Sequence, residues 1–364
     1  MPTILHKPWI VWNLLIPPGI YNNVCTVIQK KIDVGVFEPS NSLYRSHWFC
    51  VVKKDSTLLR MVQSLEPLNT VTIAHSGVPP FTEQLVEQFA GCTCAAMLDI
   101  FVRYDEHTLA EVSCDLTTFQ TPFGVLRLTT LPMGWTNSVP IFHDDVTYIL
   151  WDEIPHITVP YIDDVQIKGP TSYYRLADGS FETVPENPRI LCFIWEHFQG
   201  LNCVVQRMKY SGGTFSGYKS VLCTCKISVL GHRCTPEGRL PDPSKVDKIE
   251  KWRPLHDLSD MHAFLGTIGV CWMFIRNFTH HAHHLVKLTR KEMPFEYGQD
   301  QIAVQEDLKQ ALLASPALRP WTIHLMHQSF FPLTLHISRL AIFLGNATSI
   351  ILDYAISLSL APSH

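Results

Sequence analysis

Two adjacent aspartates, Asp163 and Asp164, lie in the middle of the segment VPYIDDVQIKG (159–169). The β-branched residues on both sides predict a hairpin with the two acids at its tip. Aspartate is common in turns because its charge is well solvated there, and this alone would explain the pair. The alternative is that a cation holds the two like charges together, since hard ions such as Mg²⁺ bind carboxylate oxygens.

A third acid, Asp99, ends the apolar run CAAMLDI (94–100), which predicts a buried strand with a carboxylate at its end. Three carboxylates at one point repel one another unless cations lie between them. Two divalent ions about 4 Å apart serve phosphoryl transfer, because one activates the attacking hydroxyl and the other holds the leaving pyrophosphate. Y-x-D-D is short enough to arise by chance, so this interpretation needs support from the neighbouring segments.

Composition narrows the classes of protein only partly. The chain has 364 residues, of which 46% are hydrophobic and 17% charged, which predicts a globular protein with two or three domains. The net charge of −4 argues against a surface coated with basic residues, but not against a local basic groove. No secretion signal is apparent, so we expect an intracellular protein of the cytoplasm or nucleus.

The 11 cysteines are scattered and odd in number, which favours a reduced protein over a disulfide scaffold. Cys92 and Cys94 form one C-x-C pair, and Cys223 and Cys225 form another. Neither has a second pair at the spacing of a zinc site, so no metal is expected there. The run HHAHH (280–284) places His280 and His284 one helical turn apart, but no acid is apparent nearby, so we favour ordinary helix residues.

The elements expected from hydrophobic periodicity alternate between helices and strands. Helices are predicted from Tyr21 to Gly35 and over 141–151, 190–209, 259–275 and 302–314, with Ser259 or Asp260 as the N-cap of the fourth. Strands are predicted over 49–62 (two strands around KDST), 94–100 and 124–131. Residues 1–20 are expected to be an extended lead-in, and 170–189 a surface insertion. Residues 339–361 are apolar but contain Asp353, so a buried strand and helix are favoured over a membrane span.

Seven segments occur in the order found in reverse transcriptases of gypsy-type (Metaviridae-like) long-terminal-repeat retrotransposons. They are GVFEPSNSLYRSHWFCVVKKDSTLLRMVQSLEPLNTVT (35–72), MLDIFVRYD (97–105), TPFGVLRLTTLPMGWTNSVPIF (121–142), YIDDV (161–165), GTFSGYKS (213–220), VLGHRCTPEGRLP (229–241) and FLGTIGVCWMFIRNF (264–278). This resemblance covers nearly the whole chain. The insertion after the Y-x-D-D hairpin makes it most similar to the fungal members.

The resemblance implies an α+β protein with the right-hand polymerase fold of fingers, palm and thumb. It implies an extended lead-in over 1–20, fingers and palm over 21–240, a thumb over 241–318, and a truncated ribonuclease H-like remnant over 319–364. In that remnant, Ser338 stands where the family carries its first metal-binding acid. We therefore expect no ribonuclease H activity.

The resemblance also implies roles for individual residues. Asp99 and Asp163 would hold two Mg²⁺ ions, with Mn²⁺ as an alternative, and Asp164 would be the third catalytic and metal-binding acid. Among the implied nucleotide-binding residues, Lys53 and Arg60 would bind the triphosphate, and Arg103 would lie beside it. Tyr104 would exclude a 2′-hydroxyl. Met133 and Gly134, together with Trp135, would pack on the templating base pair. Gly231 and His232 would grip the primer end.

Plainer interpretations and departures from the family stand beside these roles. Without the resemblance, Lys53 and Arg60 would be solvated hairpin residues and Tyr104 a core aromatic. The family usually has glycine in place of Arg103, an acid and an amide in place of the residues Ser64 and Glu66, and the order Pro-Ala in place of Val139 and Pro140. These differences are typical of a degenerate element copy.

The function implied is RNA-directed DNA polymerase, a nucleotidyltransferase that extends a primer on an RNA or DNA template with deoxynucleoside triphosphates. The alternative is an inactive, nucleic-acid-binding relic of such an enzyme. A magnesium-dependent nuclease or cyclase with a similar palm would leave LPMGW (131–135) and the thumb unexplained. No membrane partner is expected, and the sequence does not predict an oligomeric state.

Overall fold

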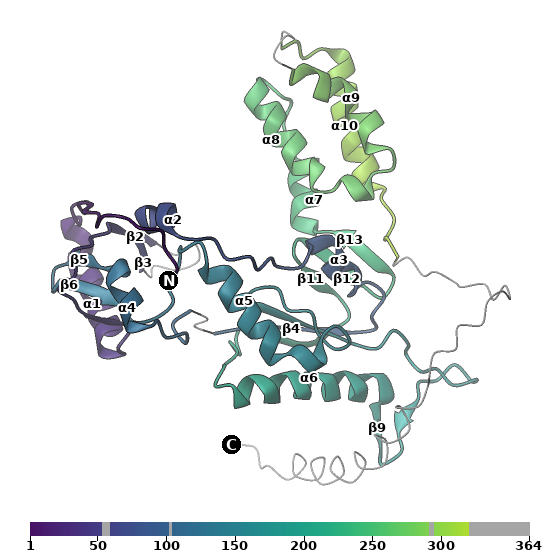
Figure 1. Ribbon diagram of the computed structural model, residues 1–364. Coiled ribbons are helices and arrows are strands. Elements are labelled where there is room, and N and C mark those ends of the chain that lie inside the picture. The colour runs from purple at the N-terminus through teal and green to yellow at the C-terminus, as the bar shows by residue number, and fades with distance from the viewer. Residues whose placement is uncertain (53–58, 102–103, 291–294, 320–364) are drawn as a thin grey trace, which may run out of the picture. The chain divides into compact units, whose positions relative to one another are not determined.

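The computed structural model describes residues 1–52, 59–101, 104–290 and 295–319 (Figure 1). These residues belong to one unit, Met1–Pro320. The predictions for Lys53 and Arg103, and those for the apolar stretch 339–361 and Ser338, lie outside the described residues. The expected remnant over 319–364 lies outside them too, apart from its first residue.

The described chain combines helices with sheets whose strands pair antiparallel, which makes this an α+β protein. The α-helices are α1 (Tyr21–Asp33), α2 (Glu66–Val71), α3 (Thr82–Glu87), α4 (Glu111–Cys114), α5 (Ser138–Ile149), α6 (Cys192–Tyr210), α7 (Pro243–Glu250), α8 (Leu258–Gly269), α9 (Phe278–Leu288) and α10 (Gln299–Leu313). The strands are β1 (Phe37–Pro39), β2 (Trp48–Val52), β3 (Leu59–Gln63), β4 (Ala95–Asp99), β5 (Phe119–Thr121), β6 (Gly124–Leu128), β7 (Asp164–Lys168), β8 (Thr183–Val184), β9 (Asn187–Leu191), β10 (Val221–Thr224), β11 (Ile227–Val229), β12 (His232–Thr235) and β13 (Gly238–Pro241).

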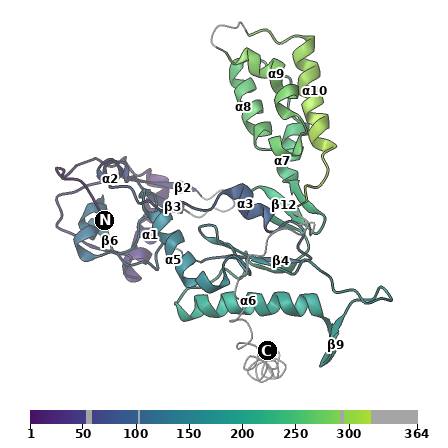
Figure 2. The same ribbon diagram turned by 45° about the vertical axis from the view of Figure 1, so that its right-hand side comes forward.

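The central antiparallel sheet has the order β10-β4-β7 and is buried on both faces of its middle strand. Ala96 and Leu98 pack into a core with α5 and α6, and α6 runs along the sheet in both Figure 1 and Figure 2. Ala95 and Met97 point the other way, into a core with α3, β11 and β12. Burial on both faces explains why this strand reads as a continuous apolar run. The predicted buried strand ending in Asp99 is therefore confirmed.

The hairpin expected around the paired aspartates is also present. The Tyr161 amide donates to the Asp164 carbonyl (2.8 Å), and the Asp164 amide donates to the Tyr161 carbonyl (3.1 Å). This leaves Ile162, with a φ of 58°, and Asp163 as the two turn residues. Asp164 is already the first residue of β7, paired with Asp99 across the ladder, so one acid rather than two lies at the tip.

The N-terminal elements form a separate small core. The hairpin β2-β3 matches the two strands predicted over 49–62, and its connection lies outside the described residues. Helix α1 and the sheet β1-β6-β5 share a hydrophobic cluster with this hairpin. As predicted, the chain leaves α1 through Gly35, whose φ of +76° favours a residue without a Cβ.

Helices α7 to α10 share another core. The helix predicted over 259–275 is α8, which ends at Gly269 and is followed by a short 3-10 turn over Trp272–Phe274. Its N-cap is Asp257, whose side chain accepts from the Asp260 amide (2.7 Å), so the predicted cap at Ser259 or Asp260 is wrong.

Helix α9 carries the run HHAHH, which was expected to be helical although the bounds of this helix were not predicted. His281 in this run pairs with Asp307 of α10, so the expectation of no nearby acid is wrong. The acid comes from a helix that is distant in sequence. Among the described residues, no helix is both long and apolar enough to cross a membrane.

Candidate active site

A pocket of about 530 Å³ brings together five of the sequence-predicted residues. Asp99, Asp163, Arg60, Tyr104 and Met133 all line it, although they come from segments far apart in the sequence. The spacing of these residues along the sequence could not show that they share one cavity. The fold brings the acids, a cation and an aromatic ring together around it.

Backbone hydrogen bonds position the two pocket acids. The Ile100 amide donates to the Asp163 carbonyl (3.0 Å), which joins the tip of the hairpin to the end of β4. The Ser216 amide donates to the Asp99 carbonyl (2.8 Å), which brings the segment 213–220 alongside β4. Asp99 therefore lies at a strand end and Asp163 in a turn, and hydrogen bonds to neighbouring segments hold both.

Lys219 is a residue that sequence reasoning missed. Its Nζ lies 3.0 and 3.2 Å from the two carboxylate oxygens of Asp99, and the lysine also lines the pocket. The segment GTFSGYKS carried a resemblance, but nothing in its pattern pointed to an acid 120 residues away. The lysine supplies a positive charge where Asp99 needs one, which offsets part of the repulsion between the pocket acids.

Two further cations, Lys31 and Arg60, line the pocket. Lys31 of α1 pairs with Asp105, and both residues line the pocket. Arg60 of β3 makes no ion pair with any residue in the described ranges. An exposed guanidinium without a carboxylate partner is suited to an anionic ligand, because its planar donors match phosphate oxygens.

Tyr104 is both a core residue and part of the pocket wall. Its side chain is buried and belongs to the core shared by α5 and α6. Its ring meets Phe142 edge-on with centroids 5.4 Å apart, and it still forms part of the pocket wall. Packing of this kind holds the ring in a fixed position beside the acids.

Other predicted residues lie outside the pocket lining. Gly134 adopts a φ of +96°, and its carbonyl accepts from Asn69 (3.0 Å). Trp135 is buried and donates to the Thr72 hydroxyl (2.9 Å), so it supports the pocket segment 131–133 from behind. Asp164 faces Asp99 in the ladder without lining the cavity.

Gly231 and His232 are also outside this lining, at the turn between β11 and β12. His232 is buried against Phe274, with ring centroids 5.7 Å apart. Burial lowers the pKa of His232, and the nearby Arg239 and Lys245 lower it further. The imidazole is therefore held neutral, as part of the packing between this hairpin and the helical segment.

The pocket's donor set fits a divalent cation. Asp99 and Asp163 offer carboxylate oxygens, which hard cations prefer, and Asp99 already takes a lysine ammonium as counter-charge. The three aspartates do not form a tight group in the described part of the chain. The group of three ligating side chains found there, with ligand atoms within 4.8 Å of one another, is Cys94, His197 and Cys223.

Comparison with known proteins relates the fold to one class. No protein-family model matches the chain. A foamy viral protease-reverse transcriptase in complex with double-stranded DNA matches with a TM-score of 0.73 and 20% identity, over 87% of this chain and 52% of that one. A second structure of such a protein with double-stranded DNA has the same TM-score and 21% identity, and covers 89% of this chain and 63% of that one. The fold is therefore that of a reverse transcriptase.

Curated sequences place the chain more narrowly. The transposon Tf2-3 polyprotein of Schizosaccharomyces pombe is 24% identical over 315 residues, which are 84% of this chain and 21% of that protein. The retrovirus-related Pol polyprotein from transposon 412 of Drosophila melanogaster is 25% identical over 296 residues, 80% of this chain and 22% of that protein. The chain spans about a fifth of the length of these relatives. It is a distant homologue of the reverse transcriptase region of retroelement Pol polyproteins.

Proposed function

We propose that this chain is an RNA-directed DNA polymerase that extends a primer by metal-dependent nucleotidyl transfer. The observation that carries the proposal is that Asp99, Asp163, Arg60 and Tyr104 line one cavity. This set supplies what the reaction requires, namely carboxylates for metal, a cation for phosphate and a ring beside the sugar. The solved reverse transcriptases that support the fold include one in complex with an RNA/DNA hybrid.

In this proposal Asp99 and Asp163 hold the divalent ions, with Asp164 behind them as the third acid. When bound, Mg²⁺ or Mn²⁺ lowers the pKa of the primer hydroxyl and neutralises charge on the leaving pyrophosphate. With Asp99 holding a metal, Lys219 would be left as a second cation for the phosphates. Arg60 binds the triphosphate through charge-assisted hydrogen bonds.

Tyr104 selects deoxyribonucleotides in this proposal, because its buried ring leaves no room for a 2′-hydroxyl. Met133 and Gly134 face the templating pair, and Gly231 and His232 hold the primer end. Residues 21–240 form fingers and palm, and 241–318 form the thumb. Lys53 and Arg103 keep their proposed contacts with the triphosphate on sequence grounds alone.

The proposed membership of one group of retrotransposons rests on the resemblance of the seven sequence segments. We place the chain with gypsy-type long-terminal-repeat elements similar to those of fungi, as a copy that has begun to diverge at Ser64, Arg103 and Val139. A diverged copy can keep its nucleic-acid-binding groove after it has lost polymerase activity. The alternative function is therefore nucleic-acid binding by an inactive relic of the enzyme.

Primer extension distinguishes the two functions. The purified chain is given a labelled primer on an RNA or a DNA template, with deoxynucleotides and Mg²⁺ or Mn²⁺. We expect extension that stops on chelation. Binding of primer-template by the folded chain, without any extension under either metal, would instead establish the relic.

A further inference from the structure

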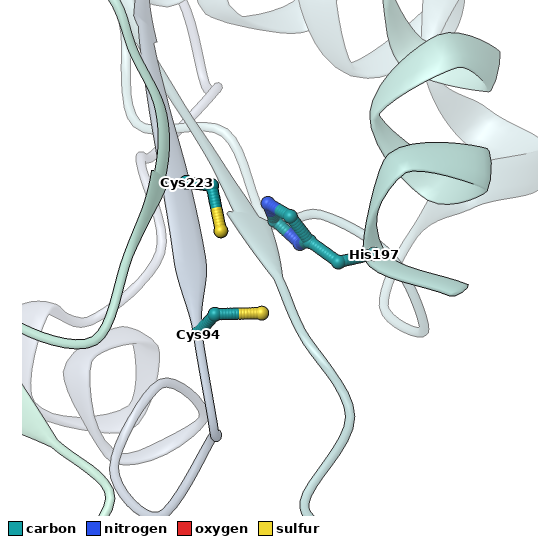
Figure 3. Close-up of side chains that lie close together, drawn as sticks. All are labelled: Cys94, His197 and Cys223. Carbon is teal, nitrogen blue, oxygen red and sulfur yellow. The ribbon is translucent and has the colours of Figure 1, made fainter. Parts of the chain in front are cut away.

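At the opposite end of β4 from Asp99, three side chains converge from three different elements (Figure 3). Cys94 immediately precedes β4, Cys223 lies on the edge strand β10, and His197 projects from α6. One ligand atom from each lies within 4.8 Å of the other two. Cys94 and Cys223 each come from a C-x-C pair that looked isolated in the sequence, and the fold brings one member of each pair together.

We propose that Cys94, His197 and Cys223 form a zinc-binding site separate from the polymerase pocket. Two sulfurs and one imidazole nitrogen make a donor set that suits Zn²⁺ and disfavours Mg²⁺. Zinc bonds of about 2.3 Å to sulfur and about 2.0 Å to nitrogen place neighbouring ligands about 3.5–3.8 Å apart in a tetrahedral site. The observed grouping is within reach of that geometry by side-chain rotation.

The surroundings of His197 support a metal ligand. The Nε2 atom lies 2.9 Å from the Leu222 carbonyl oxygen, and Nδ1 lies 3.4 Å from the Lys168 carbonyl oxygen. A neutral imidazole has one N–H, so it can donate to only one of these carbonyls. The other ring nitrogen keeps a lone pair. Metal-binding histidines usually donate their one N–H to a carbonyl that fixes the tautomer, and here the second ring nitrogen would have to turn from its carbonyl toward the two sulfurs to bind a metal.

The thiols of Cys94 and Cys223 differ in their exposure to solvent. Cys94 and His197 are buried, whereas Cys223 is an exposed residue of the edge strand, which gives an ion a way in. Burial raises the pKa of Cys94 to about 12, and burial also raises the pKa of Cys223. Both sulfurs are therefore protonated in the metal-free protein, and each releases its proton to solvent when a metal–sulfur bond forms.

A metal here would stabilise the weakest part of the central sheet. Strand β10 pairs with β4 only at Val221–Met97 and Thr224–Ala95, with an irregular register between them. Zinc bound to Cys223, Cys94 and His197 would join this edge strand to the middle strand and to α6. Because β10 follows directly after Lys219, the site would also help to hold that lysine near Asp99.

The test measures zinc on the full chain. The protein is loaded with ZnSO₄ under reducing conditions, desalted and analysed for metal content, with and without alkylation of accessible thiols. We expect about one zinc per chain, protection of Cys94 and Cys223 from alkylation, and a cobalt derivative with thiolate-to-metal absorption. Cys223→Ser and Cys94→Ser should each weaken zinc binding at least about a hundredfold.

Cys203→Ser is the matched control, since Cys203 is an exposed thiol on the same helix as His197, and it should keep the zinc. His197→Gln should lose zinc but could misfold because the ring is buried, and Cys223→Ser avoids this because its site is exposed. Equal zinc in the parent, Cys94→Ser and Cys223→Ser overturns the proposal. So does a metal-free parent in which Cys94 and Cys223 form a disulfide. These experiments measure zinc binding and not primer extension. Their outcome is therefore independent of whether the chain is a polymerase.

Discussion

The two ends of strand β4 carry opposite kinds of chemistry. Asp99 at one end opens into a pocket with a second carboxylate and Lys219, whereas Cys94 at the other end meets a cysteine and a histidine. The two residues are five positions apart, which is about 17 Å along an extended strand. One end offers oxygen atoms to a cavity that can admit substrate, and the other offers sulfur and nitrogen to a largely buried point.

If both proposals hold, one strand carries the ligands of two sites for different cations. Hard oxygen ligands suit Mg²⁺, which must keep open positions for phosphates, whereas sulfur and imidazole ligands suit Zn²⁺, whose fourth tetrahedral position the three side chains leave to another ligand. Burial separates the two ends further. The buried thiol of Cys94 stays neutral until a metal displaces its proton, whereas the pocket acids lie within reach of lysine and solvent. Specificity at each end therefore follows from ligand type and exposure together.

The largest effect is expected at the acidic end. Asp163→Asn or Asp99→Asn should lower nucleotide incorporation about a thousandfold or more, because the neutral amide cannot hold the metal charge. Affinity for primer-template should stay nearly unchanged, since phosphate contacts supply it. The measurement is single-nucleotide incorporation alongside a binding titration.

Asp178→Asn, in the exposed insertion, is the control for that pair of substitutions and should behave as the parent. If Asp163→Asn incorporates nucleotides as fast as the parent does, the assignment of Asp163 as a catalytic, metal-binding residue is wrong.

The middle of β4 links the two ends, and a cavity there should affect the whole sheet. Leu98 is buried between α5 and α6, so Leu98→Ala should lower the free energy of unfolding by about 2–5 kcal/mol. Urea denaturation gives this value directly. Val112→Ala on α4 is exposed and should change it by less than about 0.5 kcal/mol. Similar changes in the free energy of unfolding for both variants would mean that Leu98 of β4 is not an important part of the core.

Tyr104 tests whether the pocket wall sets sugar choice. Tyr104→Val should raise ribonucleotide incorporation, relative to deoxyribonucleotide, by at least about tenfold, because space opens beside the 2′-carbon. Tyr104→Phe keeps the ring and should keep the parent ratio. An unchanged ratio in the valine variant would leave Tyr104 as a packing residue only.

The smallest effect is expected at Lys219. An exposed ion pair contributes at most about 1 kcal/mol, so Lys219→Gln should tighten binding of Mn²⁺ to the acidic pocket by up to about fivefold. The reason is that metal would no longer displace the ammonium from Asp99. Titration followed by Mn²⁺ paramagnetic resonance measures this, with Lys226→Gln as the control. Weaker Mn²⁺ binding in Lys219→Gln would show that the lysine helps to hold the metal site.

The sequence by itself predicted those features that depend on neighbouring residues. The apolar run 94–100 indicated a buried strand ending in an acid, Gly35 marked the end of α1, and the hairpin around Asp163 followed from its β-branched flanks. The helix cap at Asp257 was missed, because several polar residues precede α8 and only the backbone geometry distinguishes them.

Only the tertiary structure decided what meets across the sheet. Lys219 lies against Asp99 and Asp307 lies against His281 through chain reversals that no local pattern encodes. The same holds for Cys94, His197 and Cys223, which lack any motif spacing because each comes from a different element. Local side-chain periodicity specifies which face of an element is buried, whereas contacts between distant segments depend on how those faces pack together.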